Sequence, residues 1–293
     1  MIFDFGGVAY NHLGPAQGRE WLVTNGIGGY ASGTVAGIRT RRYHGLLIAA
    51  LNPPMGRTLL LTQLDETTTY NGAGYALSAN RWASGAVEPK GYYHLQRFHL
   101  EGAIPVWTYG FADALLEKRV WMEQGSNTTY MRYDMRRGSQ PLTLAVKALV
   151  NYRDHHGGGQ AAEFQIHVDP IKPCLRISAA DGAAPFYLFS AGGEISPQYE
   201  WYKDYFLSVE AYRGLNALEN HLHVADFQVA LSVGESLTIV ATTEESPDTD
   251  GISAYTRQRS YEQELITRSQ LKEALPAVQH LVPAADQFVV RRS

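Results

Sequence analysis

Apolar and polar positions alternate in short runs along most of the chain, and turn residues separate the runs. The segments RTLLLTQLDETTTY, IPVWTYGFA and HVADFQVALSVGESLTIVATTEE are typical of β-strands, in which every second side chain is buried. Asn71-Gly72 and Gly234-Glu235 predict tight turns, and residues 114–138 predict a hairpin around Gly125-Ser126-Asn127. Short strands that recur about every ten residues predict a mostly β protein, built as one large antiparallel sandwich.

The pattern changes at residues 244–251, an acidic segment that contains proline. Residues 252–275 are rich in helix formers and end just before Pro276, so they predict a helix. We therefore place a domain boundary here and expect residues 1–245 to form the β-sandwich domain.

The remainder, residues 246–293, is predicted to be a helical linker followed by the beginning of another domain. A second helix is expected to start near Pro283, because proline suits the first turn of a helix. In that helix Leu281, Ala285 and Phe288 would share one apolar face. Because an amphipathic helix is weakly stable without a partner, we expect this one to pack on a helical domain beyond Ser293.

Composition and charge narrow the class of protein. The chain has 293 residues, of which 45% are hydrophobic, so it can bury a large core. The net charge of -4 gives no basic surplus for nucleic acid or for anionic membranes. No run approaches the ~20 apolar residues of a membrane span, and no signal peptide is recognisable. The single cysteine, Cys174, cannot form an internal disulfide, which favours a cytoplasmic location.

The segment EWLVTNGIGGYASGTVAGIRTRRYHGLL, residues 20–47, partly matches a phosphate-binding loop, since Gly26 and Gly28 begin the pattern G-x-G-x-x-G/A. The residues that follow make a poor helix, because they include glycines and β-branched side chains. The acidic residue expected about 20 positions later is also missing. We therefore reject a nucleotide cofactor. Asn25, Gly26, Gly28 and Gly29 predict an irregular loop that either brings backbone amides close to a ligand or makes a tight crossover.

Residues 39–44 read as the start of the buried strand LLIAAL. In a strand, one face would carry Arg39, Arg41 and Tyr43, and the other would carry Thr40, Arg42 and His44. Three guanidinium groups cannot all be buried without partners. Either the arginines pair with nearby carboxylates on a solvated strand, or they donate hydrogen bonds to sugar hydroxyls or to carboxylates of a second domain.

Motifs for metal binding and for nucleophilic catalysis are missing. The closely spaced histidines are His155-His156, His221-x-His223 and His94-x4-His99. They come without cysteines or an H-E-x-x-H helix, so no metal is expected. There is no G-x-S-x-G elbow, and Cys174 has no catalytic context.

Glycoside hydrolysis requires two carboxyl groups about 5–9.5 Å apart across a sugar ring. The candidates are Asp65, Glu66, Glu88, Glu101, Asp113, Glu194, Glu200 and Asp204. Their spacing singles out no pair, because carboxylates on strands meet through the fold. The aromatic clusters GYYHLQRFH and YEWYKDYF could stack on sugar rings or could simply be core and rim.

The segment at residues 20–47 resembles the N-terminal signature of bacterial and archaeal-type glycogen debranching enzymes, W-L-x-T-N-G-x-G-G-[YF]-A-S-[GS]-T followed by R-[KR]-Y-H-G-L-L. The matching residues of the first part are Trp21, Leu22, Thr24, Asn25, Gly26, Gly28, Gly29, Tyr30, Ala31, Ser32 and Thr34. Those of the second part are Arg41, Arg42, Tyr43, His44, Gly45, Leu46 and Leu47. The segments TQLDET and YRGL, and the tail AADQFVVRR, are also similar to later family positions.

The resemblance implies a β-supersandwich, similar to galactose mutarotase-like domains, that packs on an (α/α)6 barrel. The barrel would carry the acid and base carboxylates that hydrolyse α-1,6 branch points, so no catalytic residue is assigned here. The residues expected to bind substrate or to form the domain interface are Asn25, Gly26, Gly28, Gly29, Tyr30, Arg39, Arg41, Arg42, Tyr43 and His44. The expected partners are a branched, glycogen-like α-glucan and the barrel of the same chain.

Three functions follow for the chain. The first is a substrate-positioning or interface domain of a debranching glycosidase, inactive alone, with a glucanotransferase activity left open for the whole enzyme. The second is a non-catalytic α-glucan-binding module. The third is a mutarotase-like sugar epimerase, in which His94 or His99 would act with a carboxylate as acid and base.

Overall fold

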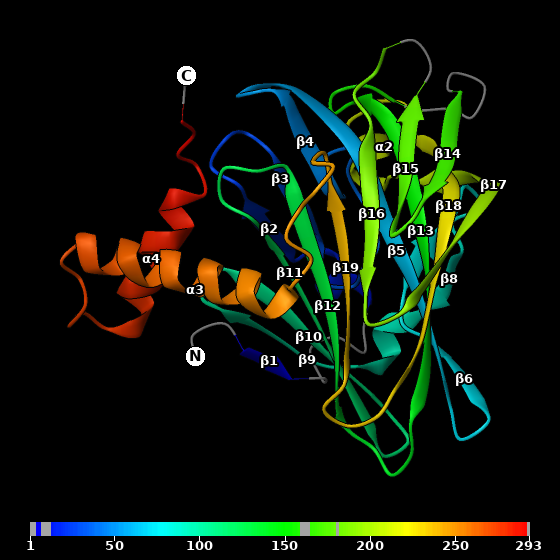
Figure 1. The fold of residues 1–293 in the computed structure, drawn as a ribbon, viewed down its shortest axis with the longest axis horizontal. Coiled ribbons are helices and arrows are strands. Elements are labelled where there is room, and N and C mark those ends of the chain that lie inside the picture. The colour runs from blue at the N-terminus through cyan, green and yellow to red at the C-terminus, as the bar shows by residue number, and fades with distance from the viewer. Residues whose placement is uncertain (1–3, 7–12, 159–164, 180–181, 292–293) are drawn as a thin grey trace.

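The structure is a computed structural model that describes residues 4–6, 13–158, 165–179 and 182–291 (Figure 1). Two large β-sheets face each other, and every described strand pair is antiparallel. The prediction of a mostly β, antiparallel supersandwich is therefore confirmed.

The nine-stranded sheet contains, in spatial order, β1 (Asp4–Gly6), β9 (Leu95–Glu101), β10 (Ile104–Phe111), β11 (Ala114–Met122), β12 (Thr128–Arg137), β19 (Ser236–Thr242), β16 (Phe186–Ala191), β15 (Cys174–Ala179) and β14 (Ile166–Ile171). The eight-stranded sheet contains β17 (Glu194–Phe206), β18 (Leu218–Leu231), β13 (Leu142–Asp154), β5 (Met55–Tyr70), β4 (Gly45–Asn52), β3 (Tyr30–Thr34) and β2 (Glu20–Thr24), with β6 (Ala73–Ala76) paired to β5. A small sheet pairs β7 (Ala79–Arg81) with β8 (Val87–Lys90). The helices are α1 (Leu13–Gln17), the 3-10 helix η2 (Gly91–His94), α2 (Ser208–Tyr212), α3 (Gly251–Arg268) and α4 (Pro276–Asp286).

The local turn signals act as predicted. Asn71 and Gly72 join β5 to β6 with φ angles of 50° and 77°, the left-handed conformation that a two-residue hairpin turn requires. Gly125 to Asn127 lie in the loop between the paired strands β11 and β12. These short-range signals therefore set the register of the strands that they join.

The core lies between the inner faces of the two large sheets. Trp21 of β2 meets Trp107 of β10 edge to face, with 5.4 Å between the ring centroids. The Trp107 indole N–H donates to the Val35 carbonyl oxygen at 3.0 Å, which satisfies its buried polar atom. Apolar side chains of both sheets form one continuous cluster around this contact, so the sandwich has a single core.

The helices α3 and α4 lie beside the sandwich, at the end away from β14 and β17 (Figure 1). The Asp250 carboxylate accepts a hydrogen bond from the Ile252 amide and so caps the start of α3. The Tyr255 ring packs edge-on against Trp121 of β11, which stacks on Tyr130 of β12 with 5.3 Å between centroids. This second apolar cluster, on the outer face of the nine-stranded sheet, holds α3 in place.

The predicted bounds of both helices are wrong. The first helix ends at Arg268, and α4 begins at Pro276 because the missing N–H of proline costs nothing in a first turn. Pro283 lies inside α4 and does not start it, while Phe288 lies beyond the helix and is 81% exposed. The domain assignment of residues 246–293 remains a proposal, and residues 292–293 lie outside the described part of the chain.

The prediction that residues 39–44 form a strand is also wrong, because β4 begins at Gly45. The Arg39 guanidinium donates to the His44 carbonyl oxygen, and the His44 amide donates to the Arg41 carbonyl oxygen. These contacts close a turn, so the alternation of faces expected for a strand does not apply. Within the part of the chain that the structure describes, no helix is long and apolar enough to cross a membrane.

Candidate functional site

The glycine-rich loop between β2 and β3 is organised by one buried amide side chain. Asn25 donates to the Ser126 carbonyl oxygen at 2.9 Å and to Asn127 Oδ1 at 3.1 Å. Its own Oδ1 accepts the Ile27 amide at 3.1 Å, which closes a local turn. Asn127 in turn donates to and accepts from the backbone of Ala50, at 2.9 Å in both cases. The loop therefore joins the eight-stranded sheet to the β11–β12 hairpin of the nine-stranded sheet.

Glycine is required in this loop for two reasons: the backbone has positive φ angles, and neighbouring atoms leave no room for a Cβ atom. Gly26 and Gly28 have φ angles of +70° and +102°, which L side chains rarely adopt. A Cβ atom at Gly28 would lie 2.7 Å from the Pro54 carbonyl oxygen, and one at Gly29 would lie 2.5 Å from the Asn25 amide nitrogen. The loop is thus a tight crossover, and its backbone also reaches the cavity described below.

Arg39 is used internally and does not face the solvent. Its guanidinium pairs with the buried Glu219 carboxylate at 2.7 Å and donates to His221 Nε2 at 2.6 Å. Arg153 shares the same carboxylate. Burial, together with the two arginines, lowers the pKa of His221 well below its usual value, so this imidazole is neutral and accepts the hydrogen bond.

Arg42 holds two loops together. Its Nε atom lies 3.2 Å from the fully buried Glu210 carboxylate of α2, which also accepts the Arg42 backbone amide at 3.0 Å. The same guanidinium donates to the His156 carbonyl oxygen. Arg42 therefore positions the loop after β13. Some of its donors already bind protein groups, so only the others are available to a ligand.

Arg41 and His44 converge on Glu20. The Arg41 Nε atom lies 2.6 Å from the Glu20 carboxylate, and His44 Nε2 lies 3.4 Å from it. His44 Nδ1 accepts the Thr40 amide at 3.2 Å, so the imidazole proton is on Nε2 and points to Glu20. The hydrogen bonds from His44 and Arg41 outweigh the effect of burial and hold the pKa of Glu20 at about 2.

An open cavity of about 370 Å³ lies next to the glycine-rich loop. Its lining residues are Leu22, Thr24, Gly26, Gly28, Gly29, Tyr30, Tyr43, Arg57, His155, His156, Gln287, Phe288, Val289 and Val290. We call this space the rim cavity. It brings together Gly26, Gly28, Gly29, Tyr30 and Tyr43 from the predicted site. The other predicted residues, Asn25, Arg39, Arg41, Arg42 and His44, do not line it but support the loops around it.

The segment after α4 forms one wall of the rim cavity. The Gln287 side-chain amide donates to the Leu22 carbonyl oxygen at 3.0 Å, and the Arg291 backbone amide donates to the Gly26 carbonyl oxygen at 2.9 Å. Phe288 and Val289 remain 81% and 62% exposed. This wall is therefore anchored by polar contacts and presents apolar side chains to the outside.

Arg57, His155 and His156 are site residues that the sequence analysis missed. The Tyr43 hydroxyl lies 3.1 Å from His156 Nδ1, and the Nε2 atoms of His156 and His155 are 2.8 Å apart. Burial, and then the neighbouring His156, lower the pKa of His155 to about 4, so this imidazole is neutral at pH 7. The adjacent histidines were visible in the sequence as candidate metal ligands, but nothing there connected them to Tyr43 or to Arg57.

The loop that carries the two histidines is held by its own hydrogen bonds. Arg153 donates to the carbonyl oxygens of Asp154 and His155, at 3.0 and 3.3 Å. The Asp154 carboxylate accepts the His156 amide at 2.8 Å. Together with the Arg42 contact, these bonds orient both imidazoles toward Tyr43.

The residues that line the rim cavity are suited to binding a ligand and not to catalysing glycoside hydrolysis. The described residues that line it include no Asp and no Glu, so the acid pair that glycoside hydrolysis requires is not found there. In the described ranges, no group of three or more His, Cys, Asp and Glu side chains is placed to hold a metal ion. The cavity offers tyrosine hydroxyls, imidazoles, a guanidinium and ring faces, which suit an uncharged ligand rich in hydroxyl groups.

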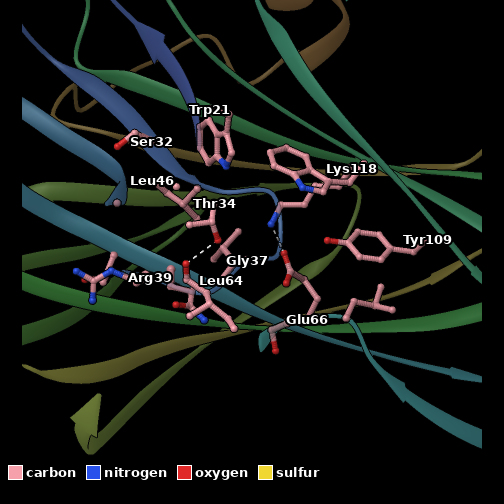
Figure 2. Close-up of a pocket in the computed structure, with 18 residues that line it drawn as sticks. Trp21, Ser32, Thr34, Gly37, Arg39, Leu46, Leu64, Glu66, Tyr109 and Lys118 are labelled. Carbon is pink, nitrogen blue, oxygen red and sulfur yellow. Dashed lines mark hydrogen bonds and ion pairs between the residues drawn. The ribbon is translucent and has the colours of Figure 1, made fainter. Parts of the chain in front are cut away.

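A second, interior cavity of about 50 Å³ lies between the two sheets (Figure 2). Glu66 of β5 and Lys118 of β11 point toward each other across it and form a buried ion pair. The Tyr133 hydroxyl donates to the same carboxylate at 2.8 Å. This space has room for a few water molecules but not for a sugar ring, so we do not count it as a glucan site.

Four of the carboxylates considered as catalytic candidates, Glu66 among them, have partners within the protein. Asp65 accepts from Gln63 and Asn80, Asp113 from Tyr70, and Glu101 from Arg119. His94 packs against Tyr75 and Phe111, and His99 is buried 3.5 Å from Glu101. His94 and His99 lie outside the lining of the rim cavity, so the geometry does not favour the epimerase hypothesis.

The fold is a β-supersandwich, and the described residues that line its rim cavity present binding groups without an acid pair. Its sequence matches the family described as glycogen debranching enzyme N terminal over residues 19–238. The chain therefore belongs to the family of glycogen debranching enzyme N-terminal domains, as the resemblance of its N-terminal signature predicted.

Comparison with solved structures finds weaker likenesses. A bacterial glucoamylase complexed with acarbose is 9% identical, with a TM-score of 0.38, over 88% of this chain and 37% of that chain. A candidate kojibiose phosphorylase from the human microbiome is 8% identical, with a TM-score of 0.32, over 93% of this chain and 31% of that chain. The chain thus spans about a third of the length of these two structures. The comparison with curated proteins gives no match.

Proposed function

We propose that this chain is the substrate-positioning and interface domain of a glycogen debranching enzyme that hydrolyses α-1,6 branch points. The observation that carries the proposal is that seven residues of the N-terminal signature line one open cavity of about 370 Å³. This volume is at the lower end of the range of about 300–1,000 Å³ for small-molecule sites. Family membership supports the proposed substrate class, a branched α-glucan.

In this proposal the chain binds and orients glucan, and the acid and base come from an (α/α)6 catalytic domain of the same protein. The rim cavity lacks carboxylates, and the exposed Phe288 and Val289 at its edge would contact that domain. The buried, unpaired Cys174 agrees with a reducing, cytoplasmic setting for the enzyme.

The test compares residues 1–293 with the same chain extended into the catalytic domain. We expect glucose to be released from a branched limit dextrin only by the extended protein, and we expect calorimetry to show millimolar binding of maltotriose to residues 1–293. Release of glucose by residues 1–293 alone would refute the division of labour. Absence of any heat with α-glucans would remove glucan binding and leave only an interface role.

A further inference from the structure

The polar wall of the rim cavity contains a chain of three hydrogen-bonded side chains. Tyr43 contacts His156 Nδ1 at 3.1 Å, and His156 Nε2 contacts His155 Nε2 at 2.8 Å. With both imidazoles neutral, each of these two contacts holds one hydrogen atom. One of the two atoms in contact donates it and the other accepts it. The protons can therefore be arranged in only two ways.

In the first arrangement the Tyr43 hydroxyl donates to His156, and His156 donates to His155. His155 then carries its single proton on Nδ1, because its Nε2 atom accepts. In the second arrangement every bond is reversed: His155 Nε2–H donates to His156, and His156 Nδ1–H donates to the Tyr43 oxygen. The Tyr43 O–H then points away from the histidines and is free to donate to another acceptor.

The surroundings of His155 decide between the two. Its Nδ1 atom is buried and has no hydrogen-bond partner among the described residues. A buried N–H without a partner is rarer in proteins than a buried acceptor without one. His155 Nδ1 is thus the unprotonated nitrogen, and the second arrangement applies. His155 is neutral at pH 7, as both arrangements require, so its tautomer is decided by the surroundings of Nδ1.

We propose that His155 and His156 are positioning residues that turn the Tyr43 hydroxyl into a hydrogen-bond donor toward the rim cavity. Arg57 also lines the rim cavity, and its guanidinium supplies a second donor there. Together they would hold an oxygen acceptor of the ligand. Resting on the proposed function, we assign this acceptor to a hydroxyl or ring oxygen of one glucose unit of an α-glucan.

The first test reads the tautomer directly and requires no sugar. In the ¹⁵N NMR spectrum of the labelled chain, the imidazole signals are assigned by their loss in His155→Gln and His156→Gln. We expect the ¹⁵N shift of a non-protonated nitrogen for His155 Nδ1 and that of a protonated nitrogen for His155 Nε2. The opposite tautomer would overturn the proposal, whatever the chain binds.

The second test measures maltotriose binding by calorimetry. Tyr43→Phe should weaken binding roughly three- to tenfold, the effect of losing one hydrogen bond. Tyr212→Phe is the matched control, because Tyr212 is 91% exposed and lies outside the cavity lining, and it should bind as wild type does. His156→Ala should weaken binding, and the Tyr43→Phe/His156→Ala double variant should bind no worse than Tyr43→Phe alone. Additive losses would show that His156 does not act through Tyr43 and would overturn its role.

Inorganic phosphate is the second titrant, because donors such as Arg57 and Tyr43 would also hold an anion. Binding of phosphate without binding of maltotriose would overturn the sugar assignment. If the wild-type chain bound neither, the ligand assignment and glucan binding by this chain would both fail. The NMR result would still decide the orientation of the Tyr43 hydroxyl.

Discussion

At the scale of single residues, the glycine-rich loop is organised by the side-chain amides of Asn25 and Asn127. Asn25 and Asn127 satisfy backbone groups that would otherwise be buried without partners. Gly28 and Gly29 are needed because other chain segments lie where a Cβ atom would be. The motif therefore has a structural role in addition to its place beside the rim cavity.

Gly29→Ala should destabilise the fold by about 1–3 kcal/mol, because the new methyl group would overlap the Asn25–Asn127 pair. The midpoint of urea unfolding measures this change. Gly74→Ala is the control, since a Cβ atom at Gly74 meets nothing within 4 Å, and its stability should change by less than about 0.5 kcal/mol. Equal stability of both variants would contradict the packing described for the loop.

Glu20→Gln should lose stability in a pH-dependent way. The folded-state pKa of about 2 lies below the ordinary value of 4.5, so the ionised carboxylate stabilises the folded state. This contribution is present above pH 4.5 and is lost as the pH falls toward 2. We expect the variant to be about 1–2 kcal/mol less stable at pH 7, because water screens the partly exposed Arg41–Glu20 pair. Unfolding curves of the two proteins should converge near pH 2, and a constant difference between pH 7 and 2 would contradict this origin.

At the scale of elements, strands and tight turns follow local patterns, whereas the 39–44 turn depends on a distant contact. The alternation of β5 and the Asn71-Gly72 turn were both predictable because their causes lie within a few residues. Residues 39–44 left the strand pattern because Arg39 is drawn to Glu219, a residue 180 positions away. A pairing at that separation leaves no local trace in the sequence.

Docking of α3 should depend on Tyr255. Tyr255→Ala removes the ring contact with Trp121 and the 2.9 Å hydrogen bond to Glu101, so we expect a loss of about 2–3 kcal/mol. Tyr255→Phe keeps the ring and should lose only about 0.5–1.5 kcal/mol. Amide hydrogen exchange should show α3 opening in Tyr255→Ala while the strands stay protected. Unchanged protection of α3 would mean that other contacts hold the helix.

At the scale of the whole molecule, polar groups link the two sheets both inside the apolar core and at its rim. The Glu66–Lys118 pair joins β5 to β11, and the Asn25–Asn127 pair joins the rims of the same two sheets. Such pairs fix how the sheets face each other, because a shift in their relative position would leave buried charges or amides without partners.

Lys118→Met should therefore destabilise the protein by about 3–5 kcal/mol, since it leaves Glu66 buried and charged without its cation. The double variant Lys118→Met/Glu66→Gln should recover part of this loss, because the introduced amide is neutral and its oxygen could still accept from Tyr133. Arg268→Ala, which removes an exposed pair with Glu264, should change stability by less than about 0.5 kcal/mol. Urea unfolding measures the stability of all three variants. A double variant that is less stable than Lys118→Met would contradict the explanation.

The sequence by itself determined the antiparallel sandwich, its turns and the family, because strand period, turn residues and the N-terminal signature are local properties of the chain. Only the tertiary structure decided which signature residues face a cavity and which support it. Tyr43 meets His156 across 113 positions of the chain, and Arg39 meets Glu219 across 180, separations that no periodicity encodes. The site is made by side chains from separate segments, which meet because the eight-stranded sheet brings the ends of its strands together and the segment after α4 forms one wall.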